Sequence, residues 1–204
     1  MSKVVVSEFV SLDGVMEDPG GSEKKKHGAW TFKFNRGAEG DKFKLDELKA
    51  SDAMLLGRVT YEGFAAAWPN RKDDIGFADT MNQMRKYVVS STLRDADATW
   101  KNSRVIRGDA AAEVAKLKAQ PGGDILVAGS AQLVGTLLDH DLVDELRLMV
   151  FPIILGSGKR LFPETNAVIN LALAESRTAG DGILMLTYRR VNTQSADDKK
   201  GGGR

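Results

Sequence analysis

The chain lacks cysteine altogether, which excludes disulfide bonds, thiolate nucleophiles and thiolate metal sites. Histidine is scarce as well. His27 and His140 are the only two, and they lie too far apart in the sequence to show a metal-ligand spacing, so we expect no metal site. A surplus of charge is also missing, because the net charge of the 204 residues is +1. The composition therefore gives no indication of a nucleic-acid partner.

Long hydrophobic runs are absent too. The apolar run Val4–Val6 is too short for a signal-peptide core or a membrane span, so we expect a cytoplasmic protein with no membrane partner. No G-x-G-x-x-G follows this run, and no G-x-S-x-G is present, which argues against a standard Rossmann site and an α/β-hydrolase. The stretch 156–159 lacks the upstream glycine of a P-loop and is followed by Arg160.

Short apolar runs alternate with helical patterns up to about residue 140, and strands follow. We expect strands at 4–10, 53–56, 86–90, 103–106, 124–128, 145–154 and 183–190, and helices at 38–50, 58–67, 109–119 and 131–138. This order predicts one α/β domain over residues 1–191, with a mostly parallel central sheet, an antiparallel C-terminal edge and helices on both faces.

The remaining segments are expected to be loops or a tail. Residues 15–37 carry Trp30, Phe32 and Phe34, which predicts a long loop that packs over the rest of the domain. We interpret 70–80 and 162–179 as loops as well. Residues 192–204 contain no aliphatic side chain larger than alanine, so we expect a disordered C-terminal tail.

Three strand ends have a chemistry that suits phosphate groups. Gly57, Arg58 and Thr60 stand where a strand turns into a helix, and a helix N-terminus offers free N–H groups and a partial positive charge. Hydroxyl groups follow a second strand, and a small-residue turn opens a helix after a third. These further candidates are Ser90, Ser91 and Thr92, and Gly129, Ser130, Ala131 and Gln132. The alternatives are a plain strand-to-helix connection with a surface arginine at the first place, a turn formed by Ser and Thr at the second, and tight packing of the helix on the sheet at the third. In a parallel sheet, however, the three ends share one edge and can converge on one extended ligand.

The same motifs, in the same order, occur in a known family. They are Ser11-Leu12-Asp13-Gly14, Leu56-Gly57-Arg58-x-Thr60-Tyr61-Glu62, Ser90-Ser91-Thr92, Gly129-Ser130 and Phe151-Pro152-x-x-Leu155-Gly156-x-Gly158-x-x-Leu161-Phe162. Over residues 3–190 the chain resembles the dihydrofolate reductase superfamily, and within it the branch related to the C-terminal reductase domain of bacterial riboflavin biosynthesis. The resemblance implies the three-layer dihydrofolate reductase-like fold.

The resemblance also implies NADPH as cofactor. Carried over by position, Gly57, Arg58 and Thr60 would hold cofactor phosphates, residues 90–92 would lie by the adenosine 2′-phosphate, and residues 129–132 would lie at the pyrophosphate. Alignment back from Gly57 places Asp41 where the folate enzymes have an acidic residue facing the pterin; the alternative is a surface carboxylate.

The implied reaction is hydride transfer from NADPH to a small heterocyclic substrate, pterin- or pyrimidine-like, or to a carbonyl compound. Asp41 or Asp13 could supply the proton, although Asp-Gly after a strand is also a common turn. Trp30 and Phe64 could stack on a flat substrate ring, with core packing as the alternative. A non-catalytic NADPH-binding protein and a dimeric interaction protein on the same fold are the other readings.

A homodimer is expected from the apolar stretch Leu146–Leu155. If this stretch is an antiparallel strand at the sheet edge, it would expose one face and a row of unpaired backbone groups, which a second copy could cover. The alternative is an internal strand that helices cover on both faces. The resemblance also implies pairing through this region.

Overall fold

The computed structural model describes residues 1–162 and 168–191. Its strands are β1 (Val4–Ser11), β2 (Ser51–Gly57), β3 (Arg85–Val89), β4 (Ser103–Ile106), β5 (Asp124–Val127), β6 (Glu145–Phe151), β7 (Leu171–Ala179) and β8 (Ile183–Arg190). Its α-helices are α1 (Gly37–Lys49), α2 (Arg58–Ala67), α3 (Phe77–Gln83), α4 (Ala110–Lys118) and α5 (Ala131–Asp139), with 3-10 turns η1 (Trp30–Lys33) and η2 (Asp95–Asp97). The expected tail lies outside the described residues.

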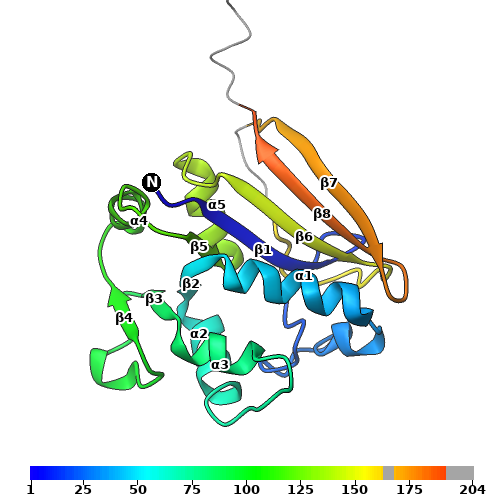
Figure 1. Ribbon diagram of the computed structural model, residues 1–204, viewed down its shortest axis with the longest axis horizontal. Helices are drawn as coiled ribbons and strands as arrows, with labels where there is room; N and C mark the ends of the chain where they lie inside the picture. The colour runs from blue at the N-terminus through cyan, green and yellow to red at the C-terminus, as the bar shows by residue number, and fades with distance from the viewer. Residues whose placement is uncertain (163–167, 192–204) are drawn as a thin grey trace, which may run out of the picture.

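The eight strands form one sheet in the order β4-β3-β2-β5-β1-β6-β8-β7 (Figure 1). The six strands from β4 to β6 pair in parallel, whereas β8 is antiparallel to β6 and β7 is antiparallel to β8. The expected α/β class, with a mostly parallel sheet and an antiparallel C-terminal edge, is therefore confirmed.

Helices cover both faces of the sheet, as expected. Val4, Val6 and Val10 of β1 share one apolar cluster with Val114 of α4 and with Leu133 of α5. Across the sheet, a second cluster joins β1 and β2 to α1, α2 and α3; its members include Val5, Leu48, Met54, Tyr61 and Met81. Because successive side chains of a strand point to opposite faces, the alternation in β1 places α4 and α5 on one side and α1, α2 and α3 on the other.

The loop after β1 packs over the domain through Trp30 and Phe34, as predicted, whereas Phe32 is exposed. Trp30 is completely buried, and its ring lies edge-on to Phe151 at a centroid distance of 5.2 Å. Asp18 organises this loop, because its carboxylate accepts hydrogen bonds from the backbone N–H groups of Glu23 and Lys25, both at 2.9 Å. Long loops that pack by their own side chains in this way frequently carry function.

Two elements correct the expectations for the loops. Helix α3 begins within the expected loop 70–80; it buries only Ala78 and Met81, so its apolar pattern is too short to stand out. Asp73 supports its start by accepting hydrogen bonds from the N–H groups of Phe77 and Ala78, at 2.8 and 2.6 Å. Strand β7 lies within the expected loop 162–179. All of its residues except Ala179 are exposed, so the alternation that identifies a half-buried strand is missing.

The expected dimer was based on an edge strand over residues 145–154, and this premise is wrong. Strand β6 is not an edge strand, because it pairs with β1 on one side and with β8 on the other. It ends at Phe151, directly before Pro152, and five of its seven residues are buried. The internal strand that stood as the alternative is therefore the correct interpretation, and β7 is the edge strand at this end of the sheet.

Candidate functional site

The predicted strand ends meet at one edge of the sheet. Strands β3, β2 and β5 are consecutive neighbours and parallel, so the residues that follow them, from Ser90, Gly57 and Gly129 onward, lie at the same carboxyl edge. Extended ligands of open α/β sheets bind at this kind of edge. The structure thus brings together the three segments that were identified separately in the sequence.

Two of these turns touch each other closely. The N–H group of Gly57 donates a hydrogen bond to the carbonyl oxygen of Gly129 at 3.3 Å. A Cβ atom added to Gly57 would lie 2.6 Å from Oγ of Ser130, and one added to Gly129 would lie 2.5 Å from Oγ1 of Thr60. Both glycines are therefore required by this close approach, and Gly129 additionally has a positive φ of 70°. The result is a cradle formed by Gly57, Thr60, Gly129 and Ser130.

The helices that begin at this cradle keep their first N–H groups available. Gly57, the N-cap of α2, has no side chain, and the hydroxyl of Ser130, the N-cap of α5, makes no capping hydrogen bond to its helix within the described chain. Helix α4 differs, because Asp109 caps it by accepting a hydrogen bond from the N–H group of Ala112 at 3.1 Å. Two open helix N-termini side by side give a concentrated partial positive charge that suits a diphosphate.

The other predicted phosphate ligands border the cradle in different ways. Arg58 is exposed, and its guanidinium group pairs with Glu62 one helical turn later at 3.0 Å. Ser91, Thr92 and Gln132 are exposed as well, and Ala131 is half-buried. These groups are accessible to a ligand, and an exposed Arg–Glu pair can be broken at little cost.

Ser90 has a local partner in this structure. It is nearly buried, and its hydroxyl oxygen accepts hydrogen bonds from the N–H groups of Thr92 and Leu93, at 3.1 and 2.9 Å. This is the self-bonded turn that Ser and Thr commonly form. The hydroxyl oxygens of Ser90 and Thr92 lie 3.4 Å apart, and either hydroxyl can donate to the other. Ser90 therefore shapes the turn, while Ser91 and Thr92 face solvent.

A buried polar cluster that sequence reasoning missed lies between β1 and α1. The hydroxyl of Ser7 donates to the carboxylate of Glu47, at 2.7 and 2.9 Å to its two oxygens, and accepts from the ammonium group of Lys44 at 2.7 Å. Lys44 also forms an ion pair with Glu47 and lies 4.9 Å from the ring centre of Phe9. The cluster is polar but internally satisfied, as buried charges must be.

Glu8, the next residue of β1, is the second functional candidate that was missed. Its carboxylate accepts a hydrogen bond from the N–H group of Gly129 in the cradle. Burial raises the pKa of Glu8 to about 8, against the opposing effects of the Gly129 hydrogen bond and of Lys44. The signal was present in the sequence, because Ser7 and Glu8 are a polar pair inside an otherwise apolar strand.

The predicted catalytic carboxylates occupy different surroundings. Asp13 joins the end of β1 to the segment after β6, because it accepts hydrogen bonds from Ser11 at 2.6 Å and from the N–H groups of Leu155 and Gly156, at 3.1 and 2.9 Å. The Ser11 hydrogen bond is the main cause that lowers the pKa of Asp13 to about 2, so this side chain is ionised at neutral pH. An ionised carboxylate is a poor proton donor. The hydrogen bonds of Asp13 indicate that it stabilises the contact between these two segments.

Asp41 lies in the first half of α1 and is accessible. Its side chain is 47% exposed and accepts a charge-assisted hydrogen bond from Nε of Arg36 at 2.5 Å. Neither carboxylate contacts the cradle in the described residues, and the structure holds no substrate to test either role. Asp41 and Asp13 as proton donors stay predictions.

The two predicted stacking residues both have core-like contacts. Besides its edge-on packing with Phe151, Trp30 donates a hydrogen bond from its ring N–H to the carbonyl oxygen of Glu17 at 2.9 Å. Phe64 is partly buried between the rings of Trp68 and Trp100, at centroid distances of 6.4 and 6.5 Å. The loop nevertheless reaches α2, since a Cβ atom added to Gly63 would lie 2.8 Å from Oγ of Ser22. The loop thus spans from β1 to the helix that begins at the cradle.

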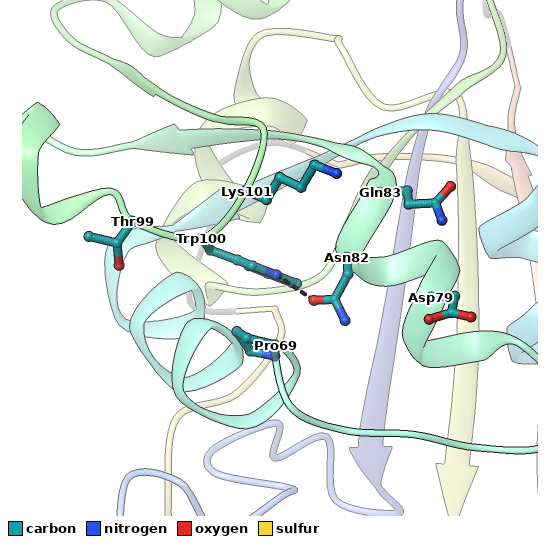
Figure 2. Close-up of a pocket in the computed structure, with 7 residues that line it drawn as sticks. All are labelled: Pro69, Asp79, Asn82, Gln83, Thr99, Trp100 and Lys101. Atoms are coloured by element: carbon teal, nitrogen blue, oxygen red, sulfur yellow. Dashed lines mark hydrogen bonds between the residues drawn. The ribbon is translucent and has the colours of Figure 1, made fainter.

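A hollow in the described residues lies elsewhere. It has a volume of about 470 Å³ and is lined by Pro69, Asp79, Asn82, Gln83, Thr99, Trp100 and Lys101 (Figure 2). The ring N–H of Trp100 donates to Asn82 at 2.7 Å in this hollow. Its lining residues Gln83 and Lys101 shortly precede β3 and β4, so the hollow lies at the amino edge of the sheet, opposite to the cradle. This hollow is therefore not part of the candidate site.

Metal binding and membrane insertion find no support in the part of the chain that the structure describes. Residues 1–162 and 168–191 contain no group of three or more His, Cys, Asp or Glu side chains arranged to hold a metal ion. Among the helices in those ranges, none has the length and apolar character needed to cross a bilayer.

Comparison with known proteins gives consistent matches along nearly the whole chain. The sequence profile of the RibD C-terminal domain matches residues 2–185. YyaP of Bacillus subtilis (strain 168), described as uncharacterized, is 30% identical over 195 residues, which cover 91% of this chain and 94% of YyaP. YwjB of the same organism, also described as uncharacterized, is 30% identical over 192 residues, with coverage of 93% and 98%.

Two solved structures have a similar fold. One is a "Putative riboflavin biosynthesis protein" from Shewanella sp. PV-4, with a TM-score of 0.74 and 22% identity, covering 94% of this chain and all of that one. The other is a pyrimidine reductase-like protein from Corynebacterium diphtheriae NCTC, with a TM-score of 0.64 and 13% identity, covering 94% and 92%. At these identities the likeness shows the fold.

Proposed function

We propose, since the chain belongs to the RibD C-terminal domain family, that it is a reductase that takes hydride from NADPH. The observation that carries this proposal is the cradle, where two helix N-termini without side-chain caps are held together by Gly57 and Gly129. A diphosphate is the group that such a pair of open N-termini suits best, because backbone N–H groups and two helix dipoles point at the same small volume.

The residues of the carboxyl edge fit the phosphates of this cofactor. The first N–H groups of α2 and α5 and the hydroxyls of Thr60 and Ser130 would bind the diphosphate. Arg58, together with Ser91 and Thr92, would bind the 2′-phosphate, which brings about two negative charges. The bound cofactor would supply the hydride, while the protein orients it and excludes water.

For the substrate, we propose a small ring or carbonyl compound that is poor in electrons. The names of the two structural neighbours, a pyrimidine reductase-like protein and a "Putative riboflavin biosynthesis protein", favour a pyrimidine-like ring among the candidates. Of the two carboxylates considered for proton delivery, we favour Asp41, because its side chain is 47% exposed, whereas Asp13 is held by Ser11 and by the N–H groups of Leu155 and Gly156.

Cofactor fluorescence and absorbance test this function. We expect the purified protein to bind NADPH more tightly than NADH, and to oxidise NADPH in the presence of at least one compound from a panel of pyrimidines, pterins and carbonyl compounds. Equal affinity for NADPH and NADH would contradict the assignment of the 2′-phosphate site. Binding without turnover on the panel would favour a non-catalytic NADPH-binding protein instead.

We also propose a homodimer that covers the C-terminal edge of the sheet. Strand β7 leaves its outer backbone groups without a neighbouring strand among the described residues, and it exposes Leu171 and Leu173. Exposed edges of this kind invite pairing with a second chain. Light scattering would contradict the dimer if the mass were near 22.1 kDa, the mass of one chain. Leu173→Lys should shift a dimer toward the monomer.

A further inference from the structure

Glu8 is an unusual residue for its position in the fold. It lies in β1 opposite Leu148 of the neighbouring strand β6, and only 8% of it is exposed. Strand alternation puts its side chain on the same face as Val6 and Val10, which belong to the apolar cluster under α5. A carboxyl group on that face costs folding free energy unless a partner compensates for the lost water.

The partner that Glu8 has is a backbone group of the cradle. Its Oε1 accepts the hydrogen bond of the Gly129 N–H group, and the described residues offer no other hydrogen bond to its carboxyl group. Gly129 is the residue before the N-cap of α5. The hydrogen bond therefore fastens the Ala128–Gly129 peptide, which carries this N–H group and borders the proposed diphosphate site.

The electrostatic surroundings of Glu8 favour its neutral form. The charged groups that influence it are Lys44 and Glu47, both on α1 on the other face of the sheet, and these two form an ion pair with each other. Burial outweighs both and raises the pKa of Glu8 to about 8. A diphosphate placed in the cradle would raise that pKa further, because a second negative charge nearby makes ionisation less favourable.

We propose that Glu8 is a positioning residue for the cofactor: its carboxyl group holds the Gly129 peptide in the orientation that the diphosphate requires, and it carries a proton whenever the diphosphate is bound. This inference rests on the proposed function, because it concerns the same cradle. It adds a residue that contacts neither the hydride nor the substrate and acts through the backbone of Gly129.

The consequence is a pH dependence of affinity that can be measured without turnover. Where the free protein loses the proton of Glu8 and the complex retains it, the dissociation constant of NADPH rises with pH. With a pKa of about 8 in the free protein, linkage gives an increase of up to about tenfold between pH 7 and pH 9. The phosphates of NADPH do not contribute, because their last ionisation, near pH 6, is complete above pH 7.

Two variants of Glu8 separate the charge from the hydrogen bond. Glu8→Gln keeps an oxygen that accepts from Gly129 and cannot ionise, whereas Glu8→Leu removes the acceptor. We expect Glu8→Gln to bind NADPH at pH 7 as the wild type does and to lose the rise toward pH 9. We expect Glu8→Leu to bind about tenfold more weakly at every pH, since the Gly129 N–H group is left without its partner. Circular dichroism verifies that each variant is folded.

The outcomes distinguish this inference from the proposed function. If the wild type binds NADPH and Glu8→Gln keeps the same pH dependence, Glu8 does not act as proposed while the function stands. If the wild type fails to bind NADPH at any pH, the function and the role of Glu8 toward it both fall.

An NMR measurement on the cofactor-free protein tests the hydrogen bond between Glu8 and Gly129. The amide resonance of Gly129 in the free protein should shift with pH around the pKa of Glu8, and the shift should be absent in Glu8→Gln. A Gly129 resonance that is insensitive to pH in the wild type would overturn the proposal even if NADPH binds, because Glu8 would then have no pH-dependent hold on that peptide.

Discussion

The amino edge of the parallel sheet and the cradle at its carboxyl edge differ in their backbone donors. At the amino edge, Asp144 accepts from the N–H group of Val4 at 2.8 Å, and Asp52 accepts from that of Gly123 at 2.7 Å. At the carboxyl edge, Asp13 binds the N–H groups of Leu155 and Gly156, but the helices that follow Gly57 and Ser130 have no side-chain acceptor among the described residues. We therefore expect the open donors of the cradle to mark the cofactor site, and not the hollow in Figure 2, which lies at the closed amino edge.

Two of the buried titratable side chains, Lys86 and Glu8, differ in a similar way. Lys86, at the start of β3, is completely buried and donates to the carbonyl oxygens of Asn82 and Lys101, at 2.7 and 3.0 Å, beneath the ring of Trp100. Its partners all belong to the local structure. Glu8 instead contacts one peptide of the open cradle. A buried charge surrounded by satisfied groups points to stability, and one that touches an open turn points to binding.

The largest expected effect comes from filling the cradle. Gly129→Ala places a Cβ atom against Thr60 at a positive φ, so we expect NADPH affinity to fall by more than about 100-fold, together with a loss of folding stability of roughly 1–3 kcal/mol. Gly108→Ala is the matched control, because Gly108 has a φ of 82° and open space around an added Cβ. Isothermal titration and urea unfolding of both variants measure the two effects. Equal loss of affinity in both would contradict the cradle.

Glu8 should also influence folding stability. Its pKa is raised from 4.5 to about 8, so the folded protein binds more protons than the unfolded chain between these values, and stability should fall as pH rises from about 4.5 to 8. We expect Glu8→Gln to flatten this decline, with the difference between wild type and variant changing by roughly 2–5 kcal/mol across that window. Urea unfolding at pH 5 and pH 8 gives the values. An unchanged difference would mean that burial does not perturb Glu8.

Lys86→Met tests the closed edge. The substitution keeps the apolar stem and removes the donor of two part-buried hydrogen bonds, to the carbonyl oxygens of Asn82 and Lys101. We therefore expect a loss of roughly 2–4 kcal/mol in the free energy of unfolding. Affinity for NADPH should stay within about twofold of the wild type, because the change lies at the opposite edge. If Lys86→Met lowers the affinity for NADPH by as much free energy as it lowers folding stability, the two edges do not differ as proposed.

The smallest expected effect concerns the preference for NADPH over NADH. Arg58→Ala should weaken NADPH binding by roughly 1–3 kcal/mol and leave NADH binding nearly unchanged, since the guanidinium group would contact the 2′-phosphate. Arg177→Ala on β7 is the matched control, because Arg177 is also an exposed arginine with a nearby glutamate partner. Fluorescence titration with both dinucleotides determines the ratio. An equal loss of affinity for NADPH and NADH would indicate that Arg58 contacts the diphosphate and not the 2′-phosphate.

The sequence predicted the features that depend on local pattern. Gly57, Ser90 and Gly129 each follow a short apolar run, and parallel pairing was enough to place their turns at one edge. It could not predict β7, because an exposed edge strand carries no apolar alternation. The assignment of residues 145–154 to an edge failed for a related reason: whether an apolar strand is central or terminal depends on pairing partners far away in the sequence.

The candidate site could be predicted only in part from the sequence, because some of its contacts join residues that are far apart in the chain. The contact of Glu8 with Gly129 spans 121 positions, and that of Ser7 with Glu47 spans 40. Neither contact can be predicted from the residues of one segment alone. What the sequence did offer was the polar pair Ser7 and Glu8 in a strand whose neighbours are valine and phenylalanine, a local conflict of the kind that often marks a functional position.

The central place of β1 has a consequence for how the chain is made. β1 is synthesised well before both strands that flank it, because β5 and β6 begin only at Asp124 and Glu145. Val4, Val5 and Val6 therefore have no partner strand until synthesis has passed Asp124. During that interval the nascent chain carries an unpaired apolar strand, which is the kind of segment that chaperones shield.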